Sequence, residues 1–139
     1  MGKWQYVLMV AFLMGCAPEV TKEIMPRLNG YWEIKKVVFP DGQIKEYGVS
    51  TTIDYIQIDG LKGFRKKVQP KFNGTFDTSN DAEFFTIRER EGAFVLFYKT
   101  QWSEWTEKLV LLDADDFSVV NEDGIRYVYK RFSPIKLEE

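Results

Sequence analysis

The stretch YWEIKKVVFPDGQ (31–43) joins an extended run to a turn. Apolar and polar side chains alternate with a period of two through residues 31–39, a pattern typical of a half-buried β-strand. Pro40-Asp41-Gly42-Gln43 follows, and this composition favours a tight turn that reverses the chain. The stretch therefore predicts the first strand of an antiparallel sheet.

The same alternation returns along the rest of the chain. No segment has the 3.6-residue period of a helix long enough for a parallel crossover connection. We therefore expect an all-β protein, an antiparallel up-and-down β-barrel of about eight strands, since closure removes exposed sheet edges. A β-sandwich is the alternative. Further strands are predicted at 52–59, 64–72, 83–89, 93–102, 105–113, 117–120 and 125–132.

Composition excludes several classes of function. The chain has 139 residues, enough for one domain, and a formal net charge of -2, which argues against a nucleic-acid partner. It has no histidine and one cysteine, so Ser-His-Asp and Cys-His catalytic arrangements are absent and metal ligands are scarce. We expect a protein that is not an enzyme and that has no metal or cofactor.

The single cysteine follows an apolar N-terminal segment. Met1-Gly-Lys3 is positively charged, and WQYVLMVAFLM (4–14) is too short to span a bilayer but suits the core of a secretory signal. Leu13-Met14-Gly15-Cys16 resembles the bacterial lipobox, although Met14 is bulkier than the residue usually found there. The resemblance implies a lipoprotein signal peptide at 1–15 and a lipid anchor on Cys16. An ordinary signal peptide or a buried N-terminal helix is the alternative.

A lipidated Cys16 would place the protein in the cell envelope. Each CH2 group of an acyl chain such as palmitate adds about 0.8 kcal/mol of binding free energy when it is buried in the bilayer. This is enough for attachment to the membrane without a spanning helix. The residue after the cysteine is Ala17 and not the aspartate that often retains lipoproteins in the inner membrane. We therefore expect the protein at the outer membrane, on either its periplasmic or its surface face. Residues 16–29 are predicted to be the lipidated cysteine and a tether with one helical turn, 30–134 the barrel and 135–139 a C-terminal tail.

LNGYWEI (28–34) resembles the Gly-x-Trp signature that opens the first strand of the lipocalin and fatty-acid-binding superfamily. The resemblance covers about residues 28–132 and the layout is similar to small lipocalin-like lipoproteins of Gram-negative bacteria. It implies that Trp32 closes the barrel floor and that a basic residue of the last strand packs across it. The implied function is binding of a small apolar or amphipathic molecule inside the barrel. The candidate basic residues are Arg126, Lys130 and Arg131.

The chain departs from the family pattern in two respects. The second lipocalin motif is missing, and the Arg-x-Tyr pair that holds a carboxylate does not transfer as a unit. Tyr127 and Tyr129 lie one and three positions after Arg126. On a regular strand, an odd spacing places both tyrosines on the face opposite to Arg126. Whether Arg126 faces inward stays open.

The strand period gives the candidate ligand-binding residues. Arg126 or Lys36 would orient an acid group of the ligand. Lys36 shares the face of Trp32 on a regular strand, although it could also lie near an open end and extend into solvent. The aromatic residues expected to line the interior are Phe64, Phe85, Phe94, Tyr98 and Trp105.

A second function class stays open on the same residues. A barrel filled by its own side chains would serve as a non-enzymatic scaffold or protein-interaction module of the envelope. Its contact surface would be the segment from Trp102 to Trp105, or the basic FRKK run (64–67), which we interpret as a solvated strand face.

Overall fold

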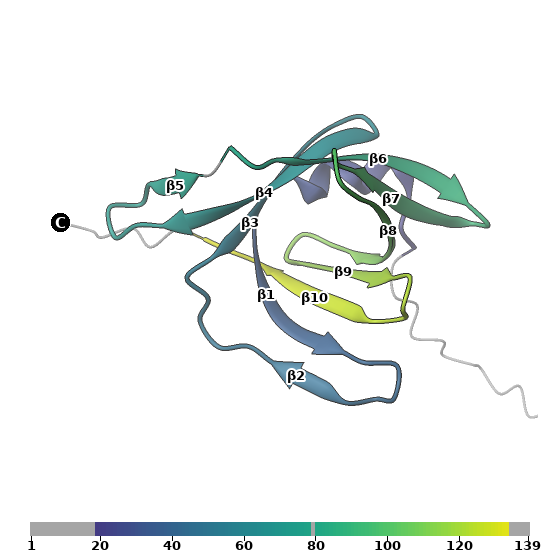
Figure 1. Cartoon of the computed structure of the whole chain (residues 1–139), viewed down its shortest axis with the longest axis horizontal. Helices are drawn as coiled ribbons and strands as arrows, with labels where there is room; N and C mark the ends of the chain where they lie inside the picture. Colours follow the sequence, from purple (N-terminus) through teal and green to yellow (C-terminus); the bar gives the residue numbers. More distant parts are fainter. Residues whose placement is uncertain (1–18, 79, 134–139) are drawn as a thin grey trace, which may run out of the picture.

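Eight strands close into an antiparallel barrel in the computed structural model, which describes residues 19–78 and 80–133 (Figure 1). A 3-10 helix, η1 (Lys22–Leu28), precedes the first strand. The strands are β1 (Gly30–Val38), β2 (Ile44–Glu46), β3 (Ile53–Asp59), β4 (Lys62–Pro70), β5 (Phe76–Thr78), β6 (Glu83–Arg90), β7 (Ala93–Lys99), β8 (Glu104–Leu112), β9 (Asp116–Asn121) and β10 (Arg126–Arg131).

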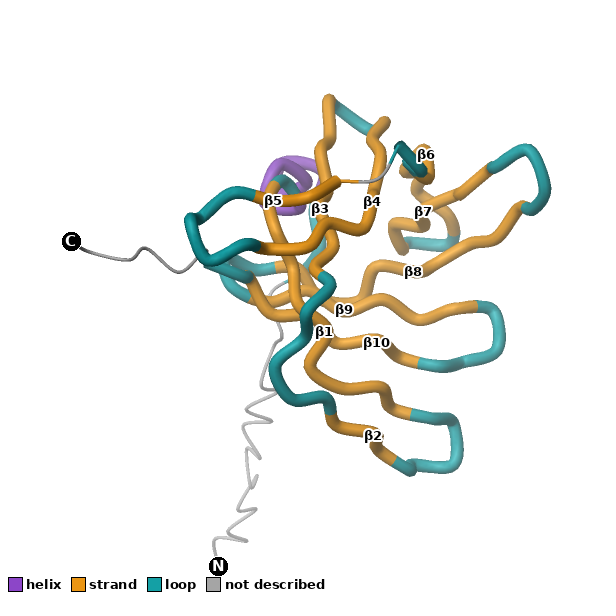
Figure 2. Tube along the Cα trace, turned by 60° about the vertical axis from the view of Figure 1, so that its left-hand side comes forward, coloured by secondary structure: helices purple, strands orange, loops and turns teal. Residues whose placement is uncertain are grey.

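Pairing of the last strand with the first closes the ring. The order is β10-β9-β8-β7-β6-β4-β3-β1, all neighbours are antiparallel, and β10 pairs again with β1. The predicted antiparallel barrel is therefore confirmed, and the β-sandwich is wrong. Each of the eight ring strands coincides with a predicted run. The short strands β2 and β5 were not predicted; they pair with the far ends of β1 and β4 and extend as hairpins beyond the ring (Figures 1 and 2).

A β-bulge corrects the predicted orientation of Lys36. Along β1, Trp32 and Ile34 pair with Arg131 and Tyr129, but the next pair joins Lys36 to Val128, so Lys35 is an extra residue. One extra residue reverses the alternation of the strand. After the bulge, Val37 is the residue that is buried, and Lys36 lies on the outer face.

Trp32 of β1 and a basic residue of β10 meet at the floor of the barrel. Trp32 is fully buried at the barrel floor, where the ring of Phe117 meets it edge-on at 4.7 Å. Leu112, at the end of β8, pairs with Phe117 and is also buried. The guanidinium of Arg131 lies over the Trp32 ring, 4.1 Å from its centroid. Arg131, and neither Arg126 nor Lys130, is therefore the basic residue that packs across the floor.

Helix η1 covers that floor. Its Met25 and Leu28 are buried in the core, and the indole Nε1 of Trp32 donates a hydrogen bond of 2.9 Å to the carbonyl oxygen of Leu28. The described part of the predicted tether is thus a packed part of the domain, because its apolar side chains cover the end of the barrel. The tether prediction is corrected there.

Several predictions lie outside the described residues. They are the signal peptide at 1–15, the lipid on Cys16 and the C-terminal tail at 135–139. Within residues 19–78 and 80–133, no helix is both long enough and apolar enough to cross a membrane.

Candidate functional site

Four of the predicted ligand-binding residues face the barrel interior. Phe85 and Tyr98 are buried and pair across β6 and β7, and their rings lie 5.3 Å apart. Phe94 packs against the edge of the same core. Trp105, at the start of β8, stacks on Tyr98 with a centroid distance of 5.0 Å and an interplanar angle of 4°.

The other predicted residues lie outside the barrel. Phe64 is on the outer face of β4, with its ring 6.1 Å from both Tyr55 and Phe84, and Phe84 is 62% exposed. Arg126 is exposed on β10 and its guanidinium lies 3.4 Å from the hydroxyl of Ser118. Together with the outward Lys36, these positions correct the prediction that Arg126 or Lys36 supplies a cation inside the barrel.

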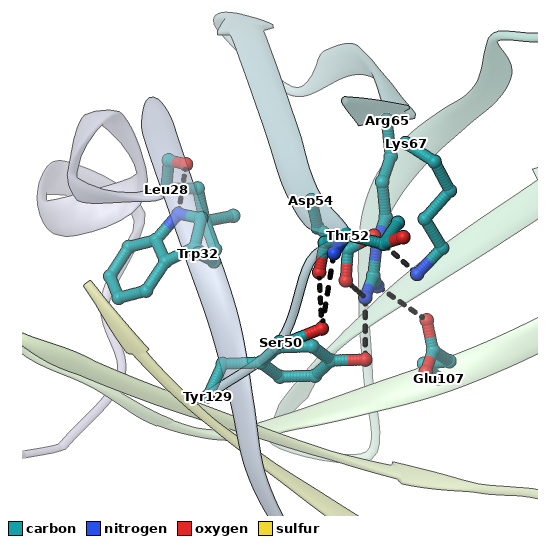
Figure 3. Close-up of polar contacts among 9 residues, drawn as sticks. All are labelled: Leu28, Trp32, Ser50, Thr52, Asp54, Arg65, Lys67, Glu107 and Tyr129. Carbon is teal, nitrogen blue, oxygen red and sulfur yellow. Dashed lines mark hydrogen bonds and ion pairs between the residues drawn. The ribbon is translucent and has the colours of Figure 1, made fainter. Parts of the chain in front are cut away.

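Arg65 is a buried cation in the barrel interior, and it reaches three neighbouring side chains (Figure 3). Its Nη2 donates to the carboxylate of Asp54 at 2.8 Å and to the hydroxyl of Tyr129 at 2.5 Å, and its Nη1 lies 3.5 Å from Glu107. The Nζ of Lys67 forms a second ion pair with Asp54 at 2.5 Å. We call these five residues the Arg65 cluster. All except Lys67 are buried or nearly so.

Burial and neighbouring charge set the ionisation of the cluster. Burial alone would raise the pKa of Asp54, but the charges of Arg65 and Lys67 outweigh it and lower the pKa below its ordinary value. Burial would lower the pKa of Arg65, but Tyr129 and Asp54 raise it well above its usual range. The pKa of Glu107 is raised because burial is the larger influence and Arg65 offsets it only in part. Burial also raises the pKa of the Tyr129 phenol to about 12.

A cavity of about 210 Å³ lies against the Arg65 cluster, and we call it the mouth cavity. Trp105, in its wall, stands at the start of β8, whereas Leu112 at the other end of that strand packs at the floor. The cavity therefore opens at the end of the barrel away from η1. Its lining residues are Asp54, Arg65, Lys66, Lys67, Asp81, Glu83, Trp105, Glu107, Tyr127 and Tyr129.

The Tyr98 hydroxyl is an unusual feature beside this cavity. The residue is 2% exposed, and its oxygen has no hydrogen-bond partner within the described part of the chain. A buried polar group in this state is costly, and native proteins rarely tolerate one without a reason. Burial raises the pKa of Tyr98; the charge of Arg65 opposes this effect and that of Glu107 adds to it, so the phenol keeps its proton and is a hydrogen-bond donor at neutral pH.

Sequence reasoning missed the Arg65 cluster, although a signal was present. Asp54 has the strand parity of Ile56, and Glu107 has the parity of Leu109, both of which are buried. A charge on the apolar face of a strand is a sign of an interior ionic network. The FRKK run is also not one basic face. Arg65 is buried inside the barrel, whereas Phe64 and Lys66 on either side of it lie on the outer face.

No group of metal-ligating side chains occurs among residues 19–78 and 80–133.

The barrel closure and the Trp32–Arg131 contact define a lipocalin-like β-barrel domain. No protein-family model matches the chain, and no curated protein matches it. Among solved structures, the chain is similar to a lipocalin-like protein from Bacteroides uniformis ATCC 8492. The sequence identity is 12%, the match covers 76% of this chain and 99% of the other, and the TM-score is 0.47.

Proposed function

We propose that this protein is an envelope lipoprotein whose barrel binds one small amphipathic molecule in the mouth cavity. The observation that carries the proposal is the mixed lining of that cavity, which combines the aromatic rings of Trp105 and Tyr127 with the buried charges of Arg65 and Glu107. Concave sites with apolar walls and a few convergent polar groups are typical ligand sites.

The ligand is small because the mouth cavity is small and buried side chains fill the floor half of the barrel. The floor half is filled by side chains that include Trp32, Leu112 and Phe117, all nearly or fully buried. The cavity of about 210 Å³ is below the volume of about 300–1,000 Å³ common for drug-sized ligands. A long acyl chain would have no room to extend beyond it.

The proposal includes no catalysis and places the protein at the outer membrane. Support for the absence of catalysis is the composition, which offers no histidine and only Cys16 as a thiol. Support for the anchor is the Leu13-Met14-Gly15-Cys16 sequence and its resemblance to the lipobox.

Native mass spectrometry of the full chain tests the proposal. The protein is purified in mild detergent from its own membranes and weighed before and after organic extraction. We expect one stoichiometric adduct that extraction removes, beside a lipid mass that remains covalently attached. A bare polypeptide mass in both samples would contradict the binding function.

A scaffold or protein-interaction role is the second candidate, and exposed apolar side chains favour it. Trp102 is 86% exposed at the tip of the β7–β8 hairpin, and Phe72 and Val49 are 85% and 97% exposed. Large apolar groups in solvent often mark contact sites. Photo-cross-linking from position 102 in intact cells would identify a specific partner band if this role holds, and no band above an exposed control position such as Glu104 if it does not.

A further inference from the structure

We infer that the molecule held in the mouth cavity is a cation, a small aromatic or aliphatic amine. This inference rests on the proposed binding function and adds the chemical class of the ligand.

The cavity wall carries an excess of negative charge. Lys66 lines it, but its Nζ lies 5.9 Å from the ring centroids of both Tyr55 and Phe64 on the outer face of the barrel. The inward cations are therefore Arg65 and Lys67. Three carboxylates that line the cavity, Asp54, Glu83 and Glu107, stand against these two cations.

Both inward cations are bound to the same carboxylate. Arg65 lies 2.8 Å and Lys67 2.5 Å from Asp54, so this carboxylate is fully compensated. Glu107 is ion-paired with Arg65 at the longer distance of 3.5 Å, and its side chain is 11% exposed. A buried carboxylate with such a long contact is the group that gains most from an added positive charge.

Aromatic rings beside Glu107 suit the same ligand. The faces of indole and phenol rings attract cations, most strongly where water is excluded. Trp105 and Tyr127 line the cavity, and one face of Trp105 is covered by Tyr98. Tyr98 is buried, and Arg65 and Glu107 are the charged groups that act on its hydroxyl.

An anionic or neutral ligand fits the wall less well. An acid would have to displace Asp54 from Arg65 or approach Glu107 and Glu83, where like charge repels it. A purely apolar molecule would remove water from the buried carboxylates and give them no partner. The charge arrangement therefore selects a cation.

Calorimetric titration of the detergent-solubilised full chain with three matched probes tests the inference. Tyramine, para-ethylphenol and phloretate share a phenol ring and differ by carrying an ammonium group, no charge or a carboxylate. We expect tyramine to bind at least about tenfold more tightly than the other two, the effect typical of a buried charge pair. Equal affinities, a preference for phloretate or no binding of any probe would overturn the inference.

Two substitutions locate the cation. Glu107→Gln keeps the shape of the side chain and should weaken tyramine binding by at least about tenfold, as expected for loss of a buried charge partner. The matched control is Glu104→Gln on the same strand, where the carboxylate is 71% exposed, and it should leave the affinity unchanged. Glu83→Gln, at the exposed rim, should give a smaller loss even if Glu107→Gln folds poorly. Unchanged tyramine affinity in both Glu107→Gln and Glu83→Gln would overturn the inference.

The outcomes separate this inference from the proposed function. If native mass spectrometry identifies a co-purified neutral or anionic molecule, the cation inference fails and the binding function stands. If the protein carries no adduct and none of the three probes binds, both fail together.

Discussion

Arg131 stacks over Trp32 and at the same time ties the chain before β1 to the barrel. The guanidinium lies 4.1 Å from the indole centroid and donates three hydrogen bonds, of 2.6, 2.8 and 2.6 Å, to the carbonyl oxygens of Arg27, Asn29 and Ala114. The planar, five-donor guanidinium is the side chain suited to this combination. Floor closure therefore depends on contacts between the two ends of the domain.

We expect Arg131→Ala to lower the free energy of unfolding by about 2–4 kcal/mol, since it removes a cation–π contact and charge-assisted hydrogen bonds. Arg131→Lys should have an intermediate effect because an ammonium group keeps the charge but not the fork. Urea denaturation followed by tryptophan fluorescence measures both. A full rescue by lysine would show that charge alone matters at the floor.

Gly30 is required by the same contact. Its φ is +123°, and a Cβ placed there would lie 2.7 Å from Nη1 of Arg131. We expect Gly30→Ala to cost about 1–3 kcal/mol of stability from backbone strain, with a further loss from displacing Arg131. Gly42→Ala is the control, because Gly42 has φ +88° with no atom within 4 Å of the added Cβ. Equal losses at both positions would mean that the clash with Arg131 contributes nothing.

Removal of the Asp54 carboxylate should be the most damaging polar substitution. Asp54→Asn leaves the buried Arg65 without its shortest ion pair, and breaking a buried pair from one side costs about 3–5 kcal/mol. The exposed Lys71–Asp77 pair is the control, and Asp77→Asn should cost less than about 1 kcal/mol. Chemical denaturation of both variants would contradict this account if Asp54→Asn were as stable as Asp77→Asn.

Glu107 and Asp54 should affect stability with opposite dependence on pH. The pKa of Glu107 is raised above 4.5, so the folded state holds this proton more tightly and its ionisation opposes folding above the folded pKa. Stability relative to Glu107→Gln should therefore increase for the wild type as the pH falls from neutral toward 4.5. The pKa of Asp54 is lowered from 3.8, so its contribution is present above that value and is lost below it as the pH falls through the folded pKa. Unfolding measured at several pH values checks both signs, and a stability difference between wild type and Glu107→Gln that does not change with pH would contradict the first.

Cys16→Ser tests the predicted anchor. Without a thiol at this position no lipid can be attached, so the mature protein should move from the membrane fraction to the periplasmic or medium fraction. Incorporation of labelled palmitate should be lost at the same time. A serine variant that stays in the membrane with its label would place the attachment elsewhere.

The strand pattern was sufficient to predict the barrel, and a bulge in β1 explains why it misplaced Lys36. Period-two alternation located all eight ring strands because each has one apolar face. Lys36 was misplaced because the extra residue Lys35 reverses the alternation within β1, and no local feature of KKVV indicates where a strand will bulge. On β8, the bulge near Val110 likewise buries Leu112 and turns Leu111 outward.

The Arg65 cluster could be predicted only in part. Asp54 and Glu107 share the apolar faces of their strands, but their convergence on Arg65 depends on which strands become neighbours across the barrel. The short strands β2 and β5 have three residues each, too few to show a period. The basic run at 64–67 was interpreted as one solvated face, although alternation places Arg65 inside.

The central claim, that a small molecule occupies the mouth cavity, is tested most directly by crystallography of the protein purified from its native cells without organic extraction. The account requires electron density for one small molecule in contact with Trp105 and Glu107, lost in crystals grown after extraction. A mouth cavity that contains only ordered water in both crystals would contradict it.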